Sequence, residues 1–314
     1  MFQSFKVSKL RQEQGNYPTQ AKGRLEWATR GSCLIPSGMR ALKISAISFL
    51  NTAPLMWDFV HQPSPEILEN FEIAYTVPSL CAEALRVGQA DIGIIPVITT
   101  AEIAGLVVLP DVAIAARNKV RSIQLVSKRP MEEIRTVAVD TSSRTSVGLT
   151  QVLLTKFFGG RRELRPMAPL LGPMLAACDA ALLIGDPAMM VQTDGLYAYD
   201  LAEVWKQKTG LPFVFAVWAV RKAALAQMRE GLDLAGIFRR SRDHGLRPES
   251  VASIAREWAR RMGLAEAEIV RYLQENIHYQ LDAECRKGLA RYFELAAECG
   301  VIERAPELEF WEGK

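Results

Sequence analysis

A nearly continuous apolar run at residues 90–97 is the feature that most restricts the fold of this chain. A strand that is apolar on both faces must be covered on both sides, which places it inside a parallel sheet. A strand pattern at 71–77 and a helix pattern at 78–87 precede this run. Gly88 stands where a glycine often ends a helix, and we expect Ser79 to cap its start. Strand, helix and buried strand together predict a βαβ unit.

The same order of patterns recurs in the second half of the chain. A strand pattern at 135–139 runs into a long helix that ends at Phe158, and an apolar run follows at 180–184. Residues 42–47 predict a further strand, the first of the chain. Two extended segments, 122–126 and 213–218, are predicted to be the crossings between the two halves. Helical periodicity dominates the C-terminal part, with helices expected at 254–262, 266–277 and 283–297.

These patterns predict an α/β fold with two lobes, a cleft between them and a helical C-terminal part, as in type II periplasmic-binding-protein-like folds. We expect residues 39–122 and 219–314 to form the first lobe and residues 123–218 the second. Residues 1–38 are polar and basic, and they are predicted to be a disordered extension. Ligands of open α/β sheets bind beyond the carboxyl ends of the strands. The strand ends of the two lobes should therefore face each other across the cleft.

Charge and cysteine content argue against several functional classes. The chain has 38 basic and 35 acidic residues, so no dense basic surface for nucleic acid is expected. Its five cysteines and three histidines are scattered, and neither a metal site nor a disulfide framework is predicted. No secretory signal or membrane-spanning pattern is apparent. We therefore expect a cytoplasmic protein with a small-molecule substrate, no cofactor and no obligate protein partner.

Hydroxyl and amide side chains gather where predicted strands give way to helices. Asn51 follows the first strand and Ser79 the second, while the run at 141–146 follows the strand at 135–139. The candidates in that run are Ser142, Ser143, Arg144 and Thr145. Because a helix N-terminus presents unpaired N–H groups and a partial positive charge, such junctions can bind carboxylates. The alternatives are ordinary helix capping and, for Arg144, a structural ion pair.

The predicted topology brings two further side chains to the cleft. Ser122 stands at the first crossing and should therefore lie in the hinge. Asp186 follows the strand at 180–184 and precedes Pro187, so it is either an acid in the cleft or a cap for a helix that begins at Pro187. Asn51 either contacts a substrate hydroxyl or shapes its own turn. The residue types alone leave these roles open.

Six segments of the chain, in their order, resemble the chorismate dehydratase family. They are residues 48–55 (SFLNTAPL), 91–97 (DIGIIPV), 120–123 (VRSI), 141–147 (TSSRTSV), 182–188 (LLIGDPA) and 209–218 (TGLPFVFAVW). Each segment is moderately specific alone, whereas the ordered set is a strong indication. It spans residues 41–220, and the helical tail is similar in character only.

The resemblance implies a lyase that removes water from chorismate, without metal or organic cofactor, to give 3-[(1-carboxyvinyl)oxy]benzoate for menaquinone biosynthesis by the futalosine route. It also implies that Asn51 and Ser122 line the substrate site and act in catalysis. Since the reaction creates an aromatic ring, the protein mainly has to orient the substrate and stabilise developing charge. The motifs contain no histidine, the commonest general base. The base is either Asp186, another carboxylate, or the enolpyruvyl carboxylate of the substrate itself.

Two other functions are compatible with the expected fold. A non-catalytic small-anion-binding protein has the same architecture, but it normally carries an export signal. The enzyme 1,4-dihydroxy-6-naphthoate synthase of the same pathway also has this fold. Its opening segment is rich in Ser, Pro and Cys, and it relies on a histidine without a counterpart in these motifs.

A chain that begins at Met39 should fold and turn over chorismate like the full chain, because residues 1–38 offer no periodic apolar positions for packing. Melting temperature and turnover of the two chains, measured side by side, test this expectation. A large fall in the melting temperature of the shorter chain would show that the extension packs on the lobes.

Overall fold

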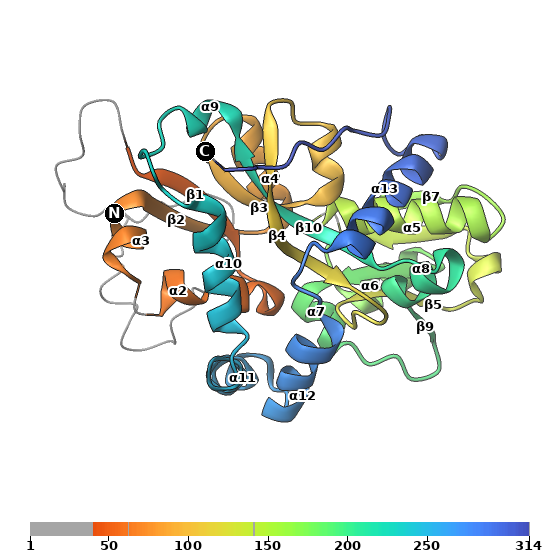
Figure 1. Cartoon of the computed structure of the whole chain (residues 1–314). Helices are drawn as coiled ribbons and strands as arrows, with labels where there is room; N and C mark the ends of the chain where they lie inside the picture. Colours follow the sequence, from red (N-terminus) through yellow and green to blue (C-terminus); the bar gives the residue numbers. More distant parts are fainter. Residues whose placement is uncertain (1–39, 62, 141, 314) are drawn as a thin grey trace, which may run out of the picture.

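Two five-stranded sheets lie side by side in the computed structural model, which describes residues 40–61, 63–140 and 142–313 (Figure 1). The extension predicted at residues 1–38 lies outside the described residues, as does Thr141. None of the helices within the described ranges is long and apolar enough to cross a membrane.

The two sheets repeat one arrangement of strands. The first has the order β2-β1-β3-β10-β4 and the second the order β7-β6-β8-β5-β9. In each, the first three strands are parallel and the fourth runs antiparallel to both of its neighbours. The first sheet consists of β1 (Leu42–Ile47), β2 (Phe71–Thr76), β3 (Ile92–Pro96), β4 (Leu106–Ala116) and β10 (Phe213–Arg221). The second consists of β5 (Ile123–Ser127), β6 (Thr136–Val139), β7 (Glu163–Pro166), β8 (Ala180–Ile184) and β9 (Tyr197–Asp200).

The segments predicted to be crossings are these fourth strands. β5 lies between β8 and β9, and β10 lies between β3 and β4. The chain crosses immediately before each of them, so the predicted placement of the crossings was wrong except for Ser122, which precedes β5. An extended pattern in the sequence indicates a strand, but it does not show in which of the two sheets that strand pairs. The predicted lobe boundaries themselves stay a prediction.

Helices cover the sheets and fill the C-terminal part. The first sheet carries α2 (Trp57–Val60), α3 (Pro65–Asn70) and α4 (Pro78–Arg86), and the second α5 (Arg144–Phe157), α6 (Leu171–Ala177), α7 (Gly185–Met190) and α8 (Leu201–Thr209). The tail contains α9 (Lys222–Leu225), α10 (Leu234–Gly245), α11 (Pro248–Met262), α12 (Glu266–Arg271) and α13 (Ala283–Glu298). The helix expected at 266–277 is divided, because a π-helical turn, Tyr272–Asn276, follows α12. Short 3₁₀ turns lie at Leu50–Thr52, Pro54–Met56, Val97–Ala101 and Met131–Glu133.

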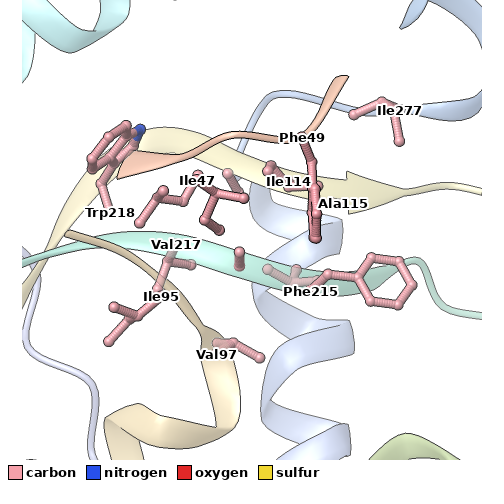
Figure 2. Close-up of a cluster of buried hydrophobic side chains, with 14 of the residues drawn as sticks. Ile47, Phe49, Ile95, Val97, Ile114, Ala115, Phe215, Val217, Trp218 and Ile277 are labelled. Carbon is pink, nitrogen blue, oxygen red and sulfur yellow. The ribbon is translucent and has the colours of Figure 1, made fainter. Parts of the chain in front are cut away.

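Apolar packing ties the lobes together at β10, which is buried from Phe213 to Val220. The rings of Trp205, Phe213 and Tyr292 meet edge to face, with centroids 4.9–6.1 Å apart, and so join α8, β10 and α13. Another part of the same core lies at β1, β3, β4 and β10 and includes Ile47, Phe49, Ile95, Ile114, Phe215 and Ile277 (Figure 2). Phe49 belongs to this part of the core, so the segment that follows β1 starts from a fixed point.

Close backbone packing fixes the next part of that segment. A Cβ atom at Gly245, the last residue of α10, would lie 2.0 Å from the carbonyl oxygen of Pro54. The Ser241 hydroxyl, one turn earlier, donates to the carbonyl oxygen of Leu55 at 2.8 Å. Helix α10 therefore holds residues 54–55 against itself, just beyond Asn51.

Candidate active site

The carboxyl ends of neighbouring parallel strands place the predicted site segments together. In the first sheet, the amide of Ser48, after β1, donates to the carbonyl oxygen of Thr76 at the end of β2, at 3.2 Å. In the second sheet, the amide of Asp140, after β6, donates to the carbonyl oxygen of Leu182 in β8, at 3.4 Å. The segments after β1, β2, β6 and β8 therefore form two edges, and hydrogen bonds join these edges across the lobes.

Asp186 makes one of the bonds between the lobes. Its Oδ1 atom accepts from the amide of Leu50 at 3.3 Å. The predicted alternative, that Asp186 caps a helix beginning at Pro187, was wrong. Helix α7 begins at Gly185, its N-cap is Ile184, and no side chain caps it. Asp186 lies in its first turn and contacts the opposite lobe instead.

Gly185 allows this approach of the lobes. It has a φ of +63°, a left-handed conformation that side chains other than glycine rarely adopt. A Cβ atom on it would also lie 3.1 Å from the Phe49 ring. Any other residue at position 185 would therefore have a strained backbone and would crowd the Phe49 ring.

Ser122 lies in the hinge, as predicted from the first crossing, and is buried. Its carbonyl oxygen accepts from the Gly185 amide at 2.7 Å, and its own amide donates to the carbonyl oxygen of Val120 at 2.8 Å. Arg121, between them, has a φ of +63°. The backbone of Ser122 is thus fixed in a tight turn directly beside Asp186's helix.

Asp200 holds this hinge turn, and the sequence reasoning missed it. Its carboxylate accepts from the amides of Val120 and Arg121, at 3.0 and 2.6 Å, and from those of Ala202 and Glu203 at the start of α8. The available signal was an aspartate directly before a helix pattern, which indicates an N-cap. Nothing local in the sequence shows that the same carboxylate also binds the hinge.

Burial changes the acidity of the groups at this junction. It raises the pKa of Asp186 to about 6, although the Leu50 amide and the charge of Arg261 act in the opposite direction. Burial also raises the pKa of Tyr272, a residue of the π-helical turn, and a hydrogen bond with Ser122 opposes that rise. The pKa of Asp186 is therefore closer to neutral pH than that of an ordinary aspartate, and a group whose pKa lies near the working pH is best suited to exchange protons in catalysis.

Two buried oxygen atoms after β1 lack a partner among the described residues. They are Asn51 Oδ1 and Ser48 Oγ. An unsatisfied buried polar atom costs about 1–3 kcal/mol. Asn51 does not use its oxygen to shape its own turn, so the atom is free to bind a ligand.

The hydroxyl-rich segments after β2 and β6 form a second candidate binding region. The amide of Ser79 donates to the carbonyl oxygen of Ser142 at 3.0 Å, which is another bond between the lobes. Ser79 is not the helix cap that we expected, because α4 begins at Pro78 and its N-cap is Val77. Ser79 and Ser142 line a cavity of about 460 Å³ together with Asp140 and residues 166–169. Asp140 Oδ1 accepts from the Ser142 amide at 2.9 Å.

The rest of the run at 141–146 makes protein contacts. Ser143 is the N-cap of α5 and accepts from the Ser146 amide. Arg144 forms an ion pair with Glu102 of the first lobe at 2.5 Å, which matches the structural alternative. Thr145 is buried, and its hydroxyl accepts from the Ile98 amide at 3.3 Å.

One group within the described ranges has the spacing of metal ligands. It consists of His278, Asp282 and Cys285, whose ligand atoms lie within 4.8 Å of one another. Asp282 already caps α13, where it accepts from the Cys285 amide, and its other oxygen pairs with His278 and Arg117 at 2.8 Å. These bonds explain why the three side chains lie close together. The group lies at the start of α13, not where the two sheet edges meet.

Comparison with known proteins supports an assignment to a family. A family model described as menaquinone biosynthesis matches residues 42–298. A chorismate dehydratase of Thermus thermophilus is 30% identical over an alignment of 276 residues, and the match covers 82% of this chain and 95% of that protein.

Two solved structures are similar in fold. An Archaeoglobus fulgidus protein has a TM-score of 0.67 at 16% identity, with 85% of this chain and 100% of that chain covered. The periplasmic aliphatic sulphonate binding protein of Escherichia coli has a TM-score of 0.59 at 18% identity, with 88% and 94% covered. The predicted periplasmic-binding-protein-like fold is therefore confirmed.

Replacing Asp186 by Asn should raise stability more at pH 8 than at pH 4. The raised pKa means that the folded state binds the Asp186 proton more tightly than the unfolded state, whose carboxyl titrates near its ordinary value of 3.8. The wild-type chain therefore loses about 2–3 kcal/mol of unfolding free energy between pH 4 and pH 6 through this group. Urea unfolding of both chains at pH 4 and pH 8 measures the difference. An equal effect of the substitution at both pH values would contradict it.

Proposed function

The chain belongs to the menaquinone biosynthesis family, and we propose that it is a chorismate dehydratase, an enzyme that removes water from chorismate to give 3-[(1-carboxyvinyl)oxy]benzoate. The observation that supports this proposal is the contact between the segment that carries Asn51 and the hinge: the Leu50 amide donates to Asp186, and the amide of Gly185, next to Asp186, donates to the Ser122 carbonyl oxygen. The likeness of 30% over nearly the whole relative supports the same substrate.

The reaction needs one proton removed and one hydroxide expelled. The hydrogen on the ring carbon that bears the enolpyruvyl ether is acidified through conjugation with the ring carboxylate. After a base takes this proton, the electron pair of the C–H bond enters the ring, and the neighbouring C–O bond breaks. The departing hydroxide takes back the proton that the base removed and leaves as water, which regenerates the base, while the ring becomes aromatic. The protein has to hold the substrate and donate hydrogen bonds to developing charge.

Asn51 and Ser122 are suited to these two tasks. The free Oδ1 atom of Asn51 can accept from the departing hydroxyl while it is still attached, which fixes the orientation of the C–O bond. The hydroxyl of Ser122 can donate to the oxygen on which negative charge develops. Both side chains start from a fixed backbone, because Phe49 packs in the core and Ser122 is bonded to Val120 and Gly185.

The substrate's own enolpyruvyl carboxylate acts as the base in this proposal. It is attached through the ether oxygen to the carbon that loses the proton, so it needs only to be held in the correct rotamer. Asp186 is the rival base in the protein, since its pKa of about 6 lies near the useful range. Its Oδ1 atom is engaged with the Leu50 amide, which favours a role in holding the lobes together.

The cavity at Ser79 and Ser142 is the proposed binding place for a substrate carboxylate. Both serine hydroxyls can donate to it, and their backbones are joined across the lobes. The Asp140 carboxylate also lines this cavity, so the substrate oxygens should approach the serine side rather than Asp140. Ser143, Arg144 and Thr145 contribute by fixing the start of α5.

The positions of the histidines disfavour the naphthoate synthase alternative. His244 pairs with Asp58, His278 pairs with Asp282, and His61 stacks on Trp57. Each is thus engaged on α2, α10 or the start of α13. None of the three belongs to the hydroxyl-rich segments at 48–55 and 141–146 or to the hinge at 120–122.

Incubation of the purified protein with chorismate should yield 3-[(1-carboxyvinyl)oxy]benzoate, and single-turnover rates should separate the roles of Asn51 and Asp186. Asn51→Ala removes a group that orients the leaving hydroxyl, so its rate should fall about tenfold to a hundredfold. Asp186→Asn should keep measurable turnover, because an amide oxygen can still accept from the Leu50 amide. Binding of chorismate without turnover in the wild-type chain would favour a binding protein. Loss of all turnover in Asp186→Asn would make Asp186 the base.

Ser142→Ala and Thr145→Ala should differ in what they change. Ser142 lines the cavity, so its loss should weaken chorismate binding about tenfold, the effect of one hydrogen bond to a charged group, with little change in melting temperature. Thr145 is buried and bonded to Ile98, so its loss should mainly lower the melting temperature. Titration of both variants with chorismate, alongside thermal unfolding, gives the comparison. Unaltered chorismate binding in Ser142→Ala would show that Ser142 has only a structural role.

A further inference from the structure

Ser48, the residue directly after β1, carries a buried hydroxyl that the proposed mechanism does not use. Ser48 is 4% exposed, and within the described ranges its Oγ atom has no hydrogen-bond partner. Most buried polar side-chain atoms in folded proteins have at least one partner. The Ser48 hydroxyl therefore needs a partner from outside the chain, which is either a water molecule or a ligand.

The local turn does not need the Ser48 hydroxyl. The Thr52 hydroxyl shares its proton between the carbonyl oxygens of Ile47 and Phe49, at 2.9 and 2.7 Å. The turn is thus closed on both sides of Ser48 by another side chain. The 3₁₀ turn Leu50–Thr52 has Phe49 as its N-cap, without a side-chain cap. The backbone is therefore fixed while the Ser48 hydroxyl stays available.

Ser48 Oγ and Asn51 Oδ1 are both buried, and both lack a partner in the part of the chain that the structure describes. The two residues are three positions apart, so their Cα atoms are at most about 11 Å apart. The 3₁₀ turn at 50–52 shortens this distance further. The second lobe reaches the same segment, since Asp186 accepts from the Leu50 amide. A small ligand held between the lobes at this point can therefore contact both oxygens.

The two side chains differ in what they can bind. The amide oxygen of Asn51 only accepts, which suits the leaving hydroxyl, whereas the Ser48 hydroxyl can also donate. A carboxylate accepts hydrogen bonds and needs a donor of this kind. In chorismate, the carbon with the leaving hydroxyl is bonded to the carbon with the enolpyruvyl ether. The enolpyruvyl carboxylate is therefore the anionic group nearest to Asn51, and Ser48 is placed to bind it.

We propose that Ser48 binds the enolpyruvyl carboxylate: its hydroxyl donates to one oxygen of that group and so holds the other oxygen towards the ring hydrogen that is removed. This inference rests on the proposed function. It assigns a protein group to the rotamer that the substrate's own base requires, and it leaves the cavity at Ser79 and Ser142 for the ring carboxylate. Ser48 keeps its proton throughout, so the proton balance of the reaction is unchanged.

The test compares two unreactive ligands that differ by this carboxylate, the product 3-[(1-carboxyvinyl)oxy]benzoate and 3-(vinyloxy)benzoate. Ser48→Ala removes the donor, so it should bind the product about tenfold more weakly than the wild type, the effect of one hydrogen bond to a charged group. Both chains should bind 3-(vinyloxy)benzoate equally. Isothermal titration calorimetry measures the four affinities. The kcat for chorismate should also fall about tenfold in Ser48→Ala, because the base is no longer held in the productive rotamer.

Ser45→Ala is the matched control. Ser45 is a buried serine of the same strand, but its hydroxyl bonds to Cys81 Sγ at 3.3 Å, so its loss should leave both affinities and kcat unchanged. Because no described group bonds to Ser48 Oγ, Ser48→Ala should melt no lower than the wild type, whereas Ser45→Ala should melt lower. Ser48→Cys keeps a side chain of similar shape with a weak donor, and it should show the same selective loss for the product.

Three results would overturn the inference. Equal weakening of both ligands in Ser48→Ala would show that Ser48 binds another part of the ligand. Unchanged affinity for the product would show that a water molecule, not the substrate, satisfies the hydroxyl. A clear fall in the melting temperature of Ser48→Ala would show that the hydroxyl has a structural partner. Each of these results leaves the proposed function intact if the wild-type chain turns over chorismate, whereas a wild-type chain without turnover would overturn the proposed function and this inference with it.

Discussion

Asp200 accepts hydrogen bonds from two amides of the hinge and from two at the start of α8, so a single carboxylate joins the hinge to this helix. Without it, four backbone N–H groups would lose this acceptor, two of them buried, and the positive φ of Arg121 would lose the hydrogen bond that stabilises it. The position of Ser122 follows from this turn, and Gly185 follows from Ser122 through their backbone bond. Asp186 then reaches Leu50. The junction therefore depends on an interaction that takes no part in the chemistry.

The repeated strand order explains why the two edges face each other. In both sheets, the strand that enters from the other lobe takes the fourth place and runs antiparallel to its neighbours. The parallel strands of each sheet consequently point their carboxyl ends towards the crossing. Helix α13 contacts both β10 and α5, so the tail joins the two lobes from outside (Figure 1).

Much of the fold could be predicted because the strongest patterns are also the most buried ones. β3 and β8 are buried at every position, and their apolar runs leave no other interpretation. β4 was missed because Pro110 and Asp111 interrupt it, as they would a turn. Asp111 has a φ of +65°, and the strand continues past it with a register shift against β10. Tertiary contacts from Arg239 and Arg242 of α10 hold this irregular point, and no local pattern reveals them.

In the candidate site, too, features that depend on the local sequence could be predicted, whereas those that depend on distant residues could not. Ser122 could be placed in the hinge from the order of the segments alone. The capping roles expected for Ser79 and Asp186 were wrong because a polar residue at a helix start looks the same whether it binds its own helix or the other lobe. Asp200 gave no functional signal, since it acts through hinge residues that lie far away in the sequence.

The unpaired oxygen of Asn51 supports a ligand site more directly than the number of hydroxyl groups after β6 does. The run at 142–146 is rich in hydroxyls, yet Ser143 and Thr145 use theirs within the protein. Asn51 Oδ1 is buried without a partner among the described residues, although an amide group rotates easily enough to find one. A protein retains such an atom at a cost in stability when a ligand satisfies it. In the proposed dehydration, an oxygen that accepts from the leaving hydroxyl must not already be engaged elsewhere, and Asn51 Oδ1 meets this condition.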